Sequence, residues 1–314
     1  MANTSLHAAK DAKNDEFYTR LEDINEEMNH YEDKFRGKVV FCNCDDPKWS
    51  NFWKYFHLNF EYLGLKKLIT THYEPEEVQS YKIEYTGGND EDFEDGVITP
   101  LTQNGDFRSP ECLALLDEAD IVVTNPPFSL FREYIQVLVE HNKEFIVIGP
   151  KNAITYKEIF PLIKDNRLWL GYGFKAGNAY FIVPKGADVS QYAKGVYDAA
   201  TNTVKFRNCT WFTNLDHVKR HERIETSYYY AKKDKLYPEL YPKYDNYDAI
   251  SVNKLAEIPC DYDGIMGVPI TFLEKYNPDQ FEIIKFRKGN DDKDLSVNGK
   301  CPYFRILIKR KAGK

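Results

Sequence analysis

The chain has 314 residues, of which 42% are hydrophobic, 29% are charged and 15% are aromatic, and its formal net charge is −7. This length accommodates one large or two ordinary globular domains with an adequate core, and it excludes a short peptide module. No stretch approaches the roughly 18 uninterrupted apolar residues of a membrane span, and the opening "MANTSLHAAKDAKNDEF" lacks an apolar signal core, so we expect a cytoplasmic protein without membrane contact.

Helices and strands alternate along the first half of the chain. The pattern of apolar residues predicts, in chain order, a helix at about 20–35, a strand at 38–42, a helix at 50–64, a strand at 66–71, a polar loop at about 86–106, a helix at about 110–117, a strand at 120–125, a helix at 129–142, a strand at 144–149 and a helix at about 155–164. Strand and helix in turn indicate an α/β fold, with a parallel sheet whose strands are joined by crossover helices.

The character of the sequence changes after these elements. "RLWLGY" (167–172) and "AYFIVP" (179–184) flank a glycine-rich connection, which predicts an antiparallel hairpin at a sheet edge. After about residue 215 the chain is rich in Tyr, Pro and Lys, and it mixes turns with short strands such as 281–288 and 301–311. We therefore predict one domain at 1–215 and a mixed α+β region at 216–314.

Charge is unevenly distributed along the chain. The overall value of −7 counts against nucleic acid as a partner, because phosphate binding usually requires a basic surface. However, residues 281–314 contain ten Lys or Arg and four Asp or Glu, a local balance of +6, whereas 89–95 contain five acids. A basic C-terminal end can bind phosphates while an acidic loop faces solvent.

Cysteine and histidine spacing does not indicate a metal site. Of the six cysteines only Cys42 and Cys44 lie close together, as Cys-x-Cys instead of the Cys-x-x-Cys of zinc sites. The seven histidines form no H-E-x-x-H pattern. We expect reduced thiols and no structural or catalytic metal.

The stretch "DIVVTNPPFSLF" (120–131) carries the strongest functional signal. An apolar strand ends in Asn125, Pro126, Pro127 and Phe128 and a helix follows, so this motif stands at the carboxyl end of a parallel strand, where open α/β sheets bind ligands. The prolines fix φ and remove two backbone donors, so the Asn125 side chain and the Pro126 carbonyl can present two acceptors together. The plainer interpretation is a rigid turn that ends the strand.

Two converging acceptors suit the two hydrogens of an exocyclic amino group on a planar base, with Phe128 stacked on the ring. Accepting both hydrogens returns the nitrogen lone pair for attack on a methyl sulfonium, so the acceleration is electrostatic and positional. A base in a duplex reaches such a pocket only if it is flipped out, at a cost on the order of a few kcal/mol.

The Asn-Pro-Pro-Phe motif does not stand alone. Further motifs are "KNDEFYT", "VVFCNCDDP", "GDFRS", "ITYKE", "YPKYDNYDAI", "GVPITFL", "FEIIKFRKG" and "NGKCPYFRILIK". With them the chain resembles, over nearly its full length, the EcoRI-type adenine-specific DNA methyltransferases of restriction-modification systems. The resemblance implies a Rossmann-like S-adenosylmethionine-dependent fold, N6 methylation of a flipped adenine in duplex DNA, a site such as GAATTC and a largely C-terminal recognition region. We expect a monomer, because these modification enzymes can act as monomers on hemimethylated sites.

The resemblance assigns roles to single residues. The catalytic motif corresponds to residues 125–128. Asp106 of "GDF" is placed to accept from the amino group of the cofactor's adenine, with Phe107 against that ring. The candidates for the methionine end of the cofactor, in "DEFYT", are Phe17, Tyr18 and Thr19. A helix start near an N-cap threonine is the alternative for this motif.

The chain departs from the family pattern after its first strand, where a glycine-rich D-P-x-x-G-x-G turn is usual. Asp46 and Pro47 are in place, but Ser50 and Phe52 stand where glycines are expected. To this cofactor pocket we assign Asn43, Asp45 and Asp46, each of which can alternatively cap the next helix. Glu74, after "LITTHY", either accepts from the ribose hydroxyls or is a solvated loop glutamate.

An acidic protein needs a local basic surface to hold DNA. The candidates for phosphate contacts are Arg287, Lys288, Lys300 and Arg305, and a basic surface strand is the alternative for each. The Tyr-rich segment 227–247 can pack against sugars and bases, or it can consist of buried tyrosines with bonded hydroxyls.

Two other functions are compatible with these motifs. Asn-Pro-Pro-aromatic loops also serve planar amino groups in RNA bases and in protein glutamine. The glycines missing after the first strand also permit a non-catalytic DNA-binding protein that has lost its cofactor.

Overall fold

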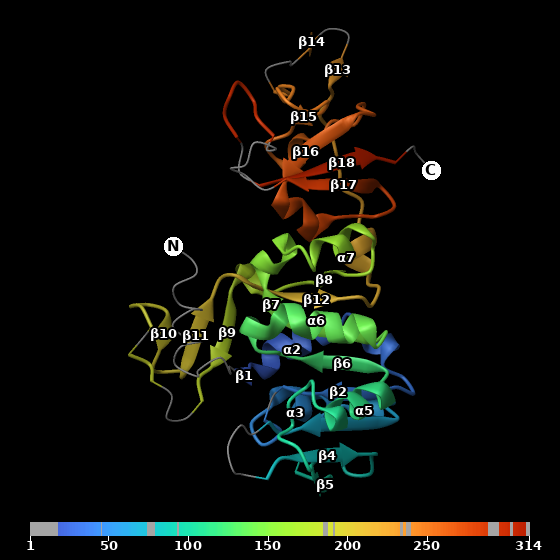
Figure 1. The fold of residues 1–314 in the computed structure, drawn as a ribbon, viewed down its shortest axis with the longest axis vertical. Helices are drawn as coiled ribbons and strands as arrows, with labels where there is room; N and C mark the ends of the chain where they lie inside the picture. The colour runs from blue at the N-terminus through green and yellow to red at the C-terminus, as the bar shows by residue number, and fades with distance from the viewer. Residues whose placement is uncertain are drawn as a thin grey trace. The chain divides into compact units, whose positions relative to one another are not determined.

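The computed structural model describes residues 18–44, 46–73, 79–92, 94–184, 188–190, 192–232, 235–236, 240–287, 295–301 and 304–311, without the side chains of 231, 232, 235, 236 and 287. Of the predicted site residues, Phe17, Asp45, Glu74 and Lys288 lie outside these ranges. The chain divides into two compact units, one of 1–153 with 170–215 and one of 154–169 with 216–314 (Figure 1). The division after 215 falls at the predicted boundary, whereas 154–169, expected in the first domain, belongs to the second unit.

A mixed eight-stranded sheet forms the centre of the first unit, in the order β5-β4-β3-β2-β6-β7-β12-β8 (Figure 1). Its strands are β2 (Val39–Cys42), β3 (Lys67–Thr71), β4 (Tyr81–Tyr85), β5 (Val97–Pro100), β6 (Ile121–Thr124), β7 (Glu144–Pro150), β8 (Trp169–Leu170) and β12 (Cys209–Thr213). The central strands β3, β2, β6 and β7 run parallel, while β4, β5 and β12 join antiparallel. Every residue of β2 and β6 is buried, as in parallel strands covered on both faces.

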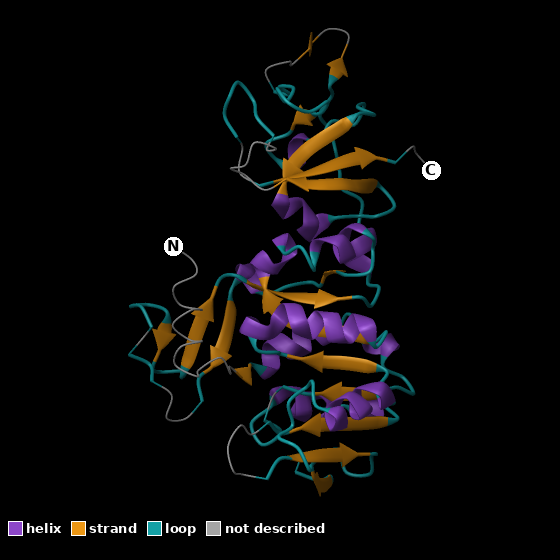
Figure 2. Cartoon of the chain, in the orientation of Figure 1, coloured by secondary structure: helices purple, strands orange, loops and turns teal. Residues whose placement is uncertain are grey.

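Helices pack on this sheet (Figure 2). They are α2 (Leu21–Met28), α3 (Asn51–Leu58), α4 (Phe60–Leu63), α5 (Pro110–Glu118) and α6 (Phe131–Glu140). Helix α3 contacts β3, α5 contacts β2 and α6 contacts β7. Serine side chains begin two of them, since Ser50 accepts hydrogen bonds from backbone amides of α3 and Ser109 does so at α5. The predicted α/β class is therefore confirmed.

A second, antiparallel sheet of the first unit has the order β1-β9-β11-β10. Its strands are β1 (Tyr18–Thr19), β9 (Ala179–Ile182), β10 (Tyr197–Asp198) and β11 (Thr203–Phe206). The predicted hairpin of 167–172 with 179–184 is therefore wrong, because β8 lies in the large sheet and β9 lies in this one. Backbone amides of Tyr172 and Gly173 donate to the Glu27 carboxylate, and this long-range anchor redirects the chain between the two strands.

The predicted loop at 86–106 is also partly wrong, because β5 lies within it. Ile98 pairs with Ile83 of β4 at the edge of the large sheet. Val97 and Ile98 remain 67% and 61% exposed, so this strand has no buried face that a periodic pattern would reveal. Backbone hydrogen bonds to β4 stabilise it instead.

The second unit contains a four-stranded sheet in the order β15-β16-β18-β17 and a short hairpin of β13 with β14. Its elements are α7 (Phe160–Lys164), β13 (Ala231–Lys232), β14 (Lys235–Leu236), β15 (Ile250–Ser251), β16 (Ile265–Pro269), β17 (Phe281–Arg287) and β18 (Arg305–Arg310). Strands β17 and β18 correspond to the strands predicted at 281–288 and 301–311. Helix α7 contacts β17 and begins later than the helix predicted at about 155–164.

Short 3-10 helices complete the described structure: η1 (Glu32–Lys34), η2 (Phe128–Leu130), η3 (Lys151–Thr155), η4 (Lys175–Gly177), η5 (Val218–His221), η6 (Leu255–Glu257) and η7 (Ile270–Lys275). Within the described ranges, no helix combines the length and the apolar character that a membrane crossing requires. In the same part of the chain, no three His, Cys, Asp or Glu side chains are grouped so that they could hold a metal ion.

Candidate functional site

The carboxyl ends of β2 and β6 form the candidate site. These strands are adjacent and parallel, with Val40 opposite Ile121. The described residues that follow them, 43–44, 46–50 and 125–128, therefore leave the sheet at the same edge, which is where open α/β sheets bind ligands. The structure thus brings the Asn-Pro-Pro-Phe motif next to the turn that replaces the glycine-rich sequence.

The Asn-Pro-Pro-Phe motif runs from the core to the surface. Asn125 and Pro126 are buried, whereas Pro127 and Phe128 are partly exposed. The Phe128 ring packs edge-on against Phe181 of β9, with ring centroids 6.4 Å apart and planes at 78°. Strand β9 of the second sheet therefore packs against the motif. The sequence of the motif did not indicate this contact.

Asn43 ties the two strand ends together. Its backbone carbonyl accepts a hydrogen bond from the Thr124 hydroxyl, and its side-chain oxygen accepts one from the Tyr134 hydroxyl of α6. Burial raises the pKa of Tyr134, so this phenol remains a neutral donor. Asn43 is itself buried, and its contacts make it part of the frame beneath the motif.

A cysteine takes up the backbone conformation for which glycine is usually selected. Cys44 has φ of 63°, in the left-handed region that a residue with a Cβ occupies at a cost. Ser50, at an expected glycine position, caps α3 with its side chain, and Phe52 is buried in the core. Because Ser50 is the N-cap, the alternative that Asn43 or Asp46 caps α3 is wrong.

Asp46 begins the tight turn before α3 and faces the end of β3. Its carboxylate accepts a hydrogen bond from the Lys48 amide at 3.0 Å, and it lies 3.8 Å from Nε2 of His72. The His72 ring stacks on Tyr81, with centroids 4.9 Å apart and planes at 10°. The Asp46 carboxylate, the His72 imidazole and the Tyr81 phenol thus lie at the same edge of the sheet.

The "GDF" motif lies against this edge as well. Gly105 has φ of 77°, and a Cβ there would overlap the His72 carbonyl, so only glycine fits. The Phe107 ring packs edge-on against Tyr134, with centroids 5.0 Å apart. Asp106 accepts hydrogen bonds from Nε and Nη2 of Arg108 at 2.8 and 2.6 Å. These bonds hold the pKa of Asp106 below its ordinary value, so the carboxylate is an ionised acceptor.

The described end of "DEFYT" reaches the same region through β1. The Thr19 carbonyl accepts a hydrogen bond at 2.7 Å from the side chain of Asn51, the first residue of α3. Tyr18 and Thr19 pair with β9, the strand that carries Phe181. Helix α2 begins at Leu21, and its N-cap position has no side-chain cap, so the alternative that Thr19 caps this helix is wrong.

The predicted basic residues that are described lie in the second unit. Arg287 and Arg305 occupy directly opposite positions in the register of β17 and β18. Lys300 is exposed at the end of the 297–300 turn, where its backbone pairs with that of Val297. The Asp245 carboxylate accepts hydrogen bonds from the backbone amides of Asn298 and Gly299 at 3.1 and 2.9 Å, which holds this turn.

Sequence reasoning missed several residues of the site. His72 directly follows a predicted parallel strand, so its position at the carboxyl edge was available as a signal. Tyr81 and Tyr134 gave no such signal, because β4 was not predicted and Tyr134 matches the apolar face of an ordinary amphipathic helix.

Comparison with known proteins agrees with this geometry. The family described as "Adenine-specific methyltransferase EcoRI" matches residues 5–311. The type II methyltransferase M.EcoRI of Escherichia coli is 50% identical over 320 residues, which cover 98% of this chain and 97% of that protein. M.MgeORF184P of Mycoplasma genitalium is 38% identical, over 97% of this chain and 98% of that protein. M.MpnI of Mycoplasma pneumoniae is 38% identical, over 98% of both.

No solved structure matches the chain. The family match and the three relatives are nevertheless sufficient, since each spans nearly the whole length. They also overturn the interpretation of a non-catalytic protein, because the family consists of enzymes that transfer methyl groups. The chain therefore belongs to the EcoRI family of adenine-specific methyltransferases.

Proposed function

We propose that this enzyme transfers a methyl group from S-adenosylmethionine to N6 of a flipped-out adenine in duplex DNA, as the modification partner of a restriction system. The observation that carries the proposal is the Asn-Pro-Pro-Phe motif at the carboxyl end of β6, beside the acceptor-lined end of β2, in a member of an adenine-specific family. By similarity to M.EcoRI, we propose GAATTC or a related site.

The catalytic roles follow from the chemistry of the amino group. The Asn125 side-chain oxygen and the Pro126 carbonyl accept its two hydrogens, and Phe128 stacks on the base. These contacts localise the lone pair on N6, which is otherwise delocalised into the ring, and align it for attack. When bound, S-adenosylmethionine would supply an electrophilic methyl group: the N6 lone pair forms the new bond to carbon, and the electron pair of the carbon–sulfur bond stays on sulfur. The methylated N6 then loses one proton to water.

The residues present fit an adenosine-containing cofactor. The carboxylates of Asp46 and Asp106 are partly exposed, at 23% and 20%, and can accept from hydroxyl and amino donors. The rings of Phe107 and Tyr81 offer apolar faces for an adenine. We assign the adenosine end to these four residues and to Glu74. The methionine end falls to Phe17, Tyr18 and Thr19, with Asn43 and Asp45 completing the pocket.

The DNA contacts belong to the second unit in this proposal. Arg287, Lys288, Lys300 and Arg305 neutralise phosphates, which fix the position of the duplex without reading its sequence. Arg287 and Arg305 occupy opposite positions of β17 and β18, so the two belong to one end of this strand pair. We propose that the enzyme works as a monomer in the cytoplasm.

The test measures incorporation of labelled methyl groups into duplex DNA, RNA and protein under identical conditions. We expect label in duplex DNA only. Label confined to RNA or protein would overturn the proposal in favour of another planar amino group as the acceptor. Single-molecule sequencing of DNA from cells that express the protein then identifies the modified base and its surrounding sequence.

A further inference from the structure

A buried carboxylate on α2 anchors the loop that follows β8. Glu27 is 1% exposed. One of its oxygens accepts from the Tyr172 amide at 2.9 Å and from the Tyr31 hydroxyl at 3.0 Å, and the other accepts from the Gly173 amide at 3.0 Å. A buried carboxylate without donors would be very unfavourable, so these three hydrogen bonds account for its position.

The loop is shaped to receive this carboxylate. A Cβ at Gly171 would overlap Oε1 of Glu27 and would lie 2.9 Å from Cβ of Trp211, so only glycine allows the close approach. The Tyr172 ring stacks on His30, in the turn that follows α2, with centroids 3.3 Å apart and planes at 7°. Helix α2 therefore holds the backbone of this loop, and the turn that follows α2 holds one of its side chains.

A chain of aromatic contacts leads from the loop to the catalytic motif. Phe174 stacks on Trp211, with centroids 5.7 Å apart and planes at 24°. It also packs edge-on against Phe181 at 6.3 Å. Phe181 in turn packs edge-on against Phe128 at 6.4 Å. The orientation of Phe128 therefore depends on Phe181, and Phe181 packs on Phe174, which directly follows the two amides that Glu27 holds.

We propose that Glu27 is a positioning residue for methyl transfer, which holds the loop 171–174 so that Phe174 and Phe181 keep the ring of Phe128 in its catalytic orientation. The inference rests on the proposed role of Phe128. Glu27 does not touch the reacting atoms. Its effect passes through backbone amides and packed rings, and a displacement of a catalytic group by about 1 Å can reduce turnover by about 100-fold.

The test substitutions are Glu27→Gln and Glu26→Gln. Glutamine has the size of glutamate, but its amide group places a donor against one of the loop amides, which breaks one anchor. Glu26 is the matched control, because it lies on the same helix and forms an ion pair with Lys175, the residue that follows this loop, but at the surface. Exposed pairs contribute little, so this control loses the same charge without loosening the anchor.

Two readouts separate positioning from general destabilisation. For Glu27→Gln we expect the turnover number to fall about 10- to 100-fold, with the dissociation constant of S-adenosylmethionine within twofold of the wild-type value. With 4-fluorophenylalanine at position 128, we expect the fluorine resonance of Glu27→Gln to shift or broaden. Glu26→Gln keeps the wild-type turnover and resonance. If both variants give the same resonance and the same turnover, the inference is wrong.

A second variant covers the possibility that Glu27→Gln does not fold. Phe174→Leu breaks the aromatic chain at a half-buried position and leaves the carboxylate contacts in place. We expect the same change in the resonance at position 128. An unchanged resonance in Phe174→Leu contradicts the inference. Because this signal needs no DNA, it stays decisive even if the wild-type enzyme fails to methylate duplex DNA, a result that would contradict the proposed function alone.

Discussion

The hydroxyl of Tyr134 donates a hydrogen bond to the side-chain oxygen of Asn43, and this bond joins the helix that follows the catalytic motif to the end of β2. Both residues are buried. Tyr134→Phe leaves the Asn43 oxygen without this donor, and we expect the free energy of unfolding to fall by about 1–3 kcal/mol. Chemical denaturation measures the change.

The control for this substitution is Tyr62→Phe, which removes a hydroxyl that donates to Glu32 at the surface. We expect a loss below about 0.5 kcal/mol there, because water replaces the donor. Equal losses in the two variants would show that the hydrogen bond between Tyr134 and Asn43 contributes no more to the free energy of unfolding than a hydrogen bond at the surface.

Cys44 has a left-handed backbone conformation, so we expect a substitution there to raise stability instead of lowering it. Cys44→Gly removes the Cβ that disfavours this conformation, and we expect the free energy of unfolding to rise by about 0.5–1 kcal/mol. At Cys260, which does not have positive φ, glycine should lower stability by a similar amount. Urea unfolding of both variants checks the signs, and destabilisation by Cys44→Gly would contradict the argument.

Asn125→Ala tests the proposed catalytic amide. Removing one of the two acceptors leaves the amino group partly conjugated, so we expect the turnover number to fall at least about 100-fold. The dissociation constant of S-adenosylmethionine should remain close to that of the wild type. Ser129→Ala, an exposed neighbour, is the control and should keep its turnover. Near-wild-type turnover in Asn125→Ala would exclude the amide from the chemistry.

Lys300 tests the proposed phosphate contacts. We expect Lys300→Ala to weaken DNA binding by a similar factor for all sequences. The slope of log K against the logarithm of the salt concentration should become shallower by about one. Lys157→Ala is the control, because this lysine is 89% exposed in the same unit but outside the basic segment. Binding measured at several salt concentrations compares the two. Identical salt dependence in both variants would remove Lys300 from the interface.

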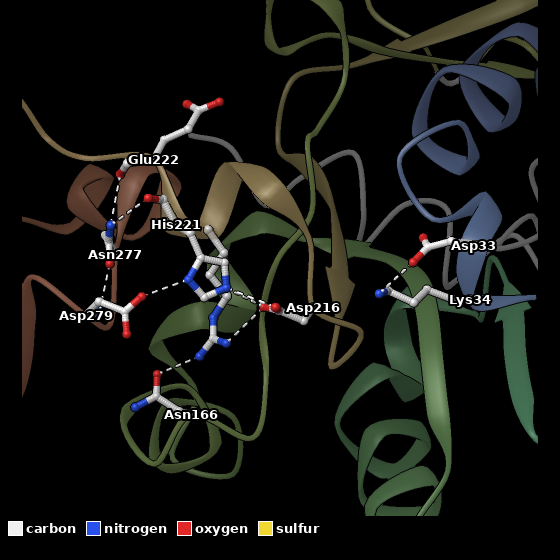
Figure 3. Close-up of polar contacts among 9 residues, drawn as sticks. Asp33, Lys34, Asn166, Asp216, His221, Glu222, Asn277 and Asp279 are labelled. Atoms are coloured by element: carbon white, nitrogen blue, oxygen red, sulfur yellow. Dashed lines mark hydrogen bonds and ion pairs between the residues drawn. The ribbon is translucent and has the colours of Figure 1, made fainter.

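His221 predicts a pH dependence of stability (Figure 3). Nδ1 lies 2.8 Å from the Asp279 carboxylate, and Nε2 lies 2.9 Å from that of Asp216, which Arg220 also contacts. The hydrogen bonds to Asp279 and then Asp216 raise the pKa of His221. A raised pKa contributes stability that is complete below about pH 6.5, the value of an unperturbed histidine, and is lost as pH rises through the folded-state value.

We therefore expect His221→Gln to lower the melting temperature more at pH 6 than at pH 8.5. The effect remains below about 1 kcal/mol, because the pairs are partly exposed. Asp279→Asn removes the nearer partner and should reduce the pH dependence without abolishing it. Melting curves at both pH values decide, and a His221→Gln effect that is equal at both would contradict the assignment.

Local sequence determined the parallel core of the first unit. Apolar runs such as 39–42 and 121–124 are buried on both faces, and each is followed by an amphipathic helix, so periodicity alone indicated α/β. The motif at 125–128 could also be predicted from the sequence, because two prolines after a buried strand restrict the backbone wherever they occur. The residues that gave the family resemblance were equally local.

Tertiary structure alone decided which residues support the site. The bond between Tyr134 and Asn43, and the anchoring of Gly173 by Glu27, join segments that are distant in sequence and carry no local signal. The same applies to β5, an exposed strand that exists because β4 offers its backbone groups. The periodicity of apolar residues indicates which positions are buried. The two hydrogen bonds and the strand β5 depend instead on which residue or strand lies opposite, and only the folded chain specifies that neighbour.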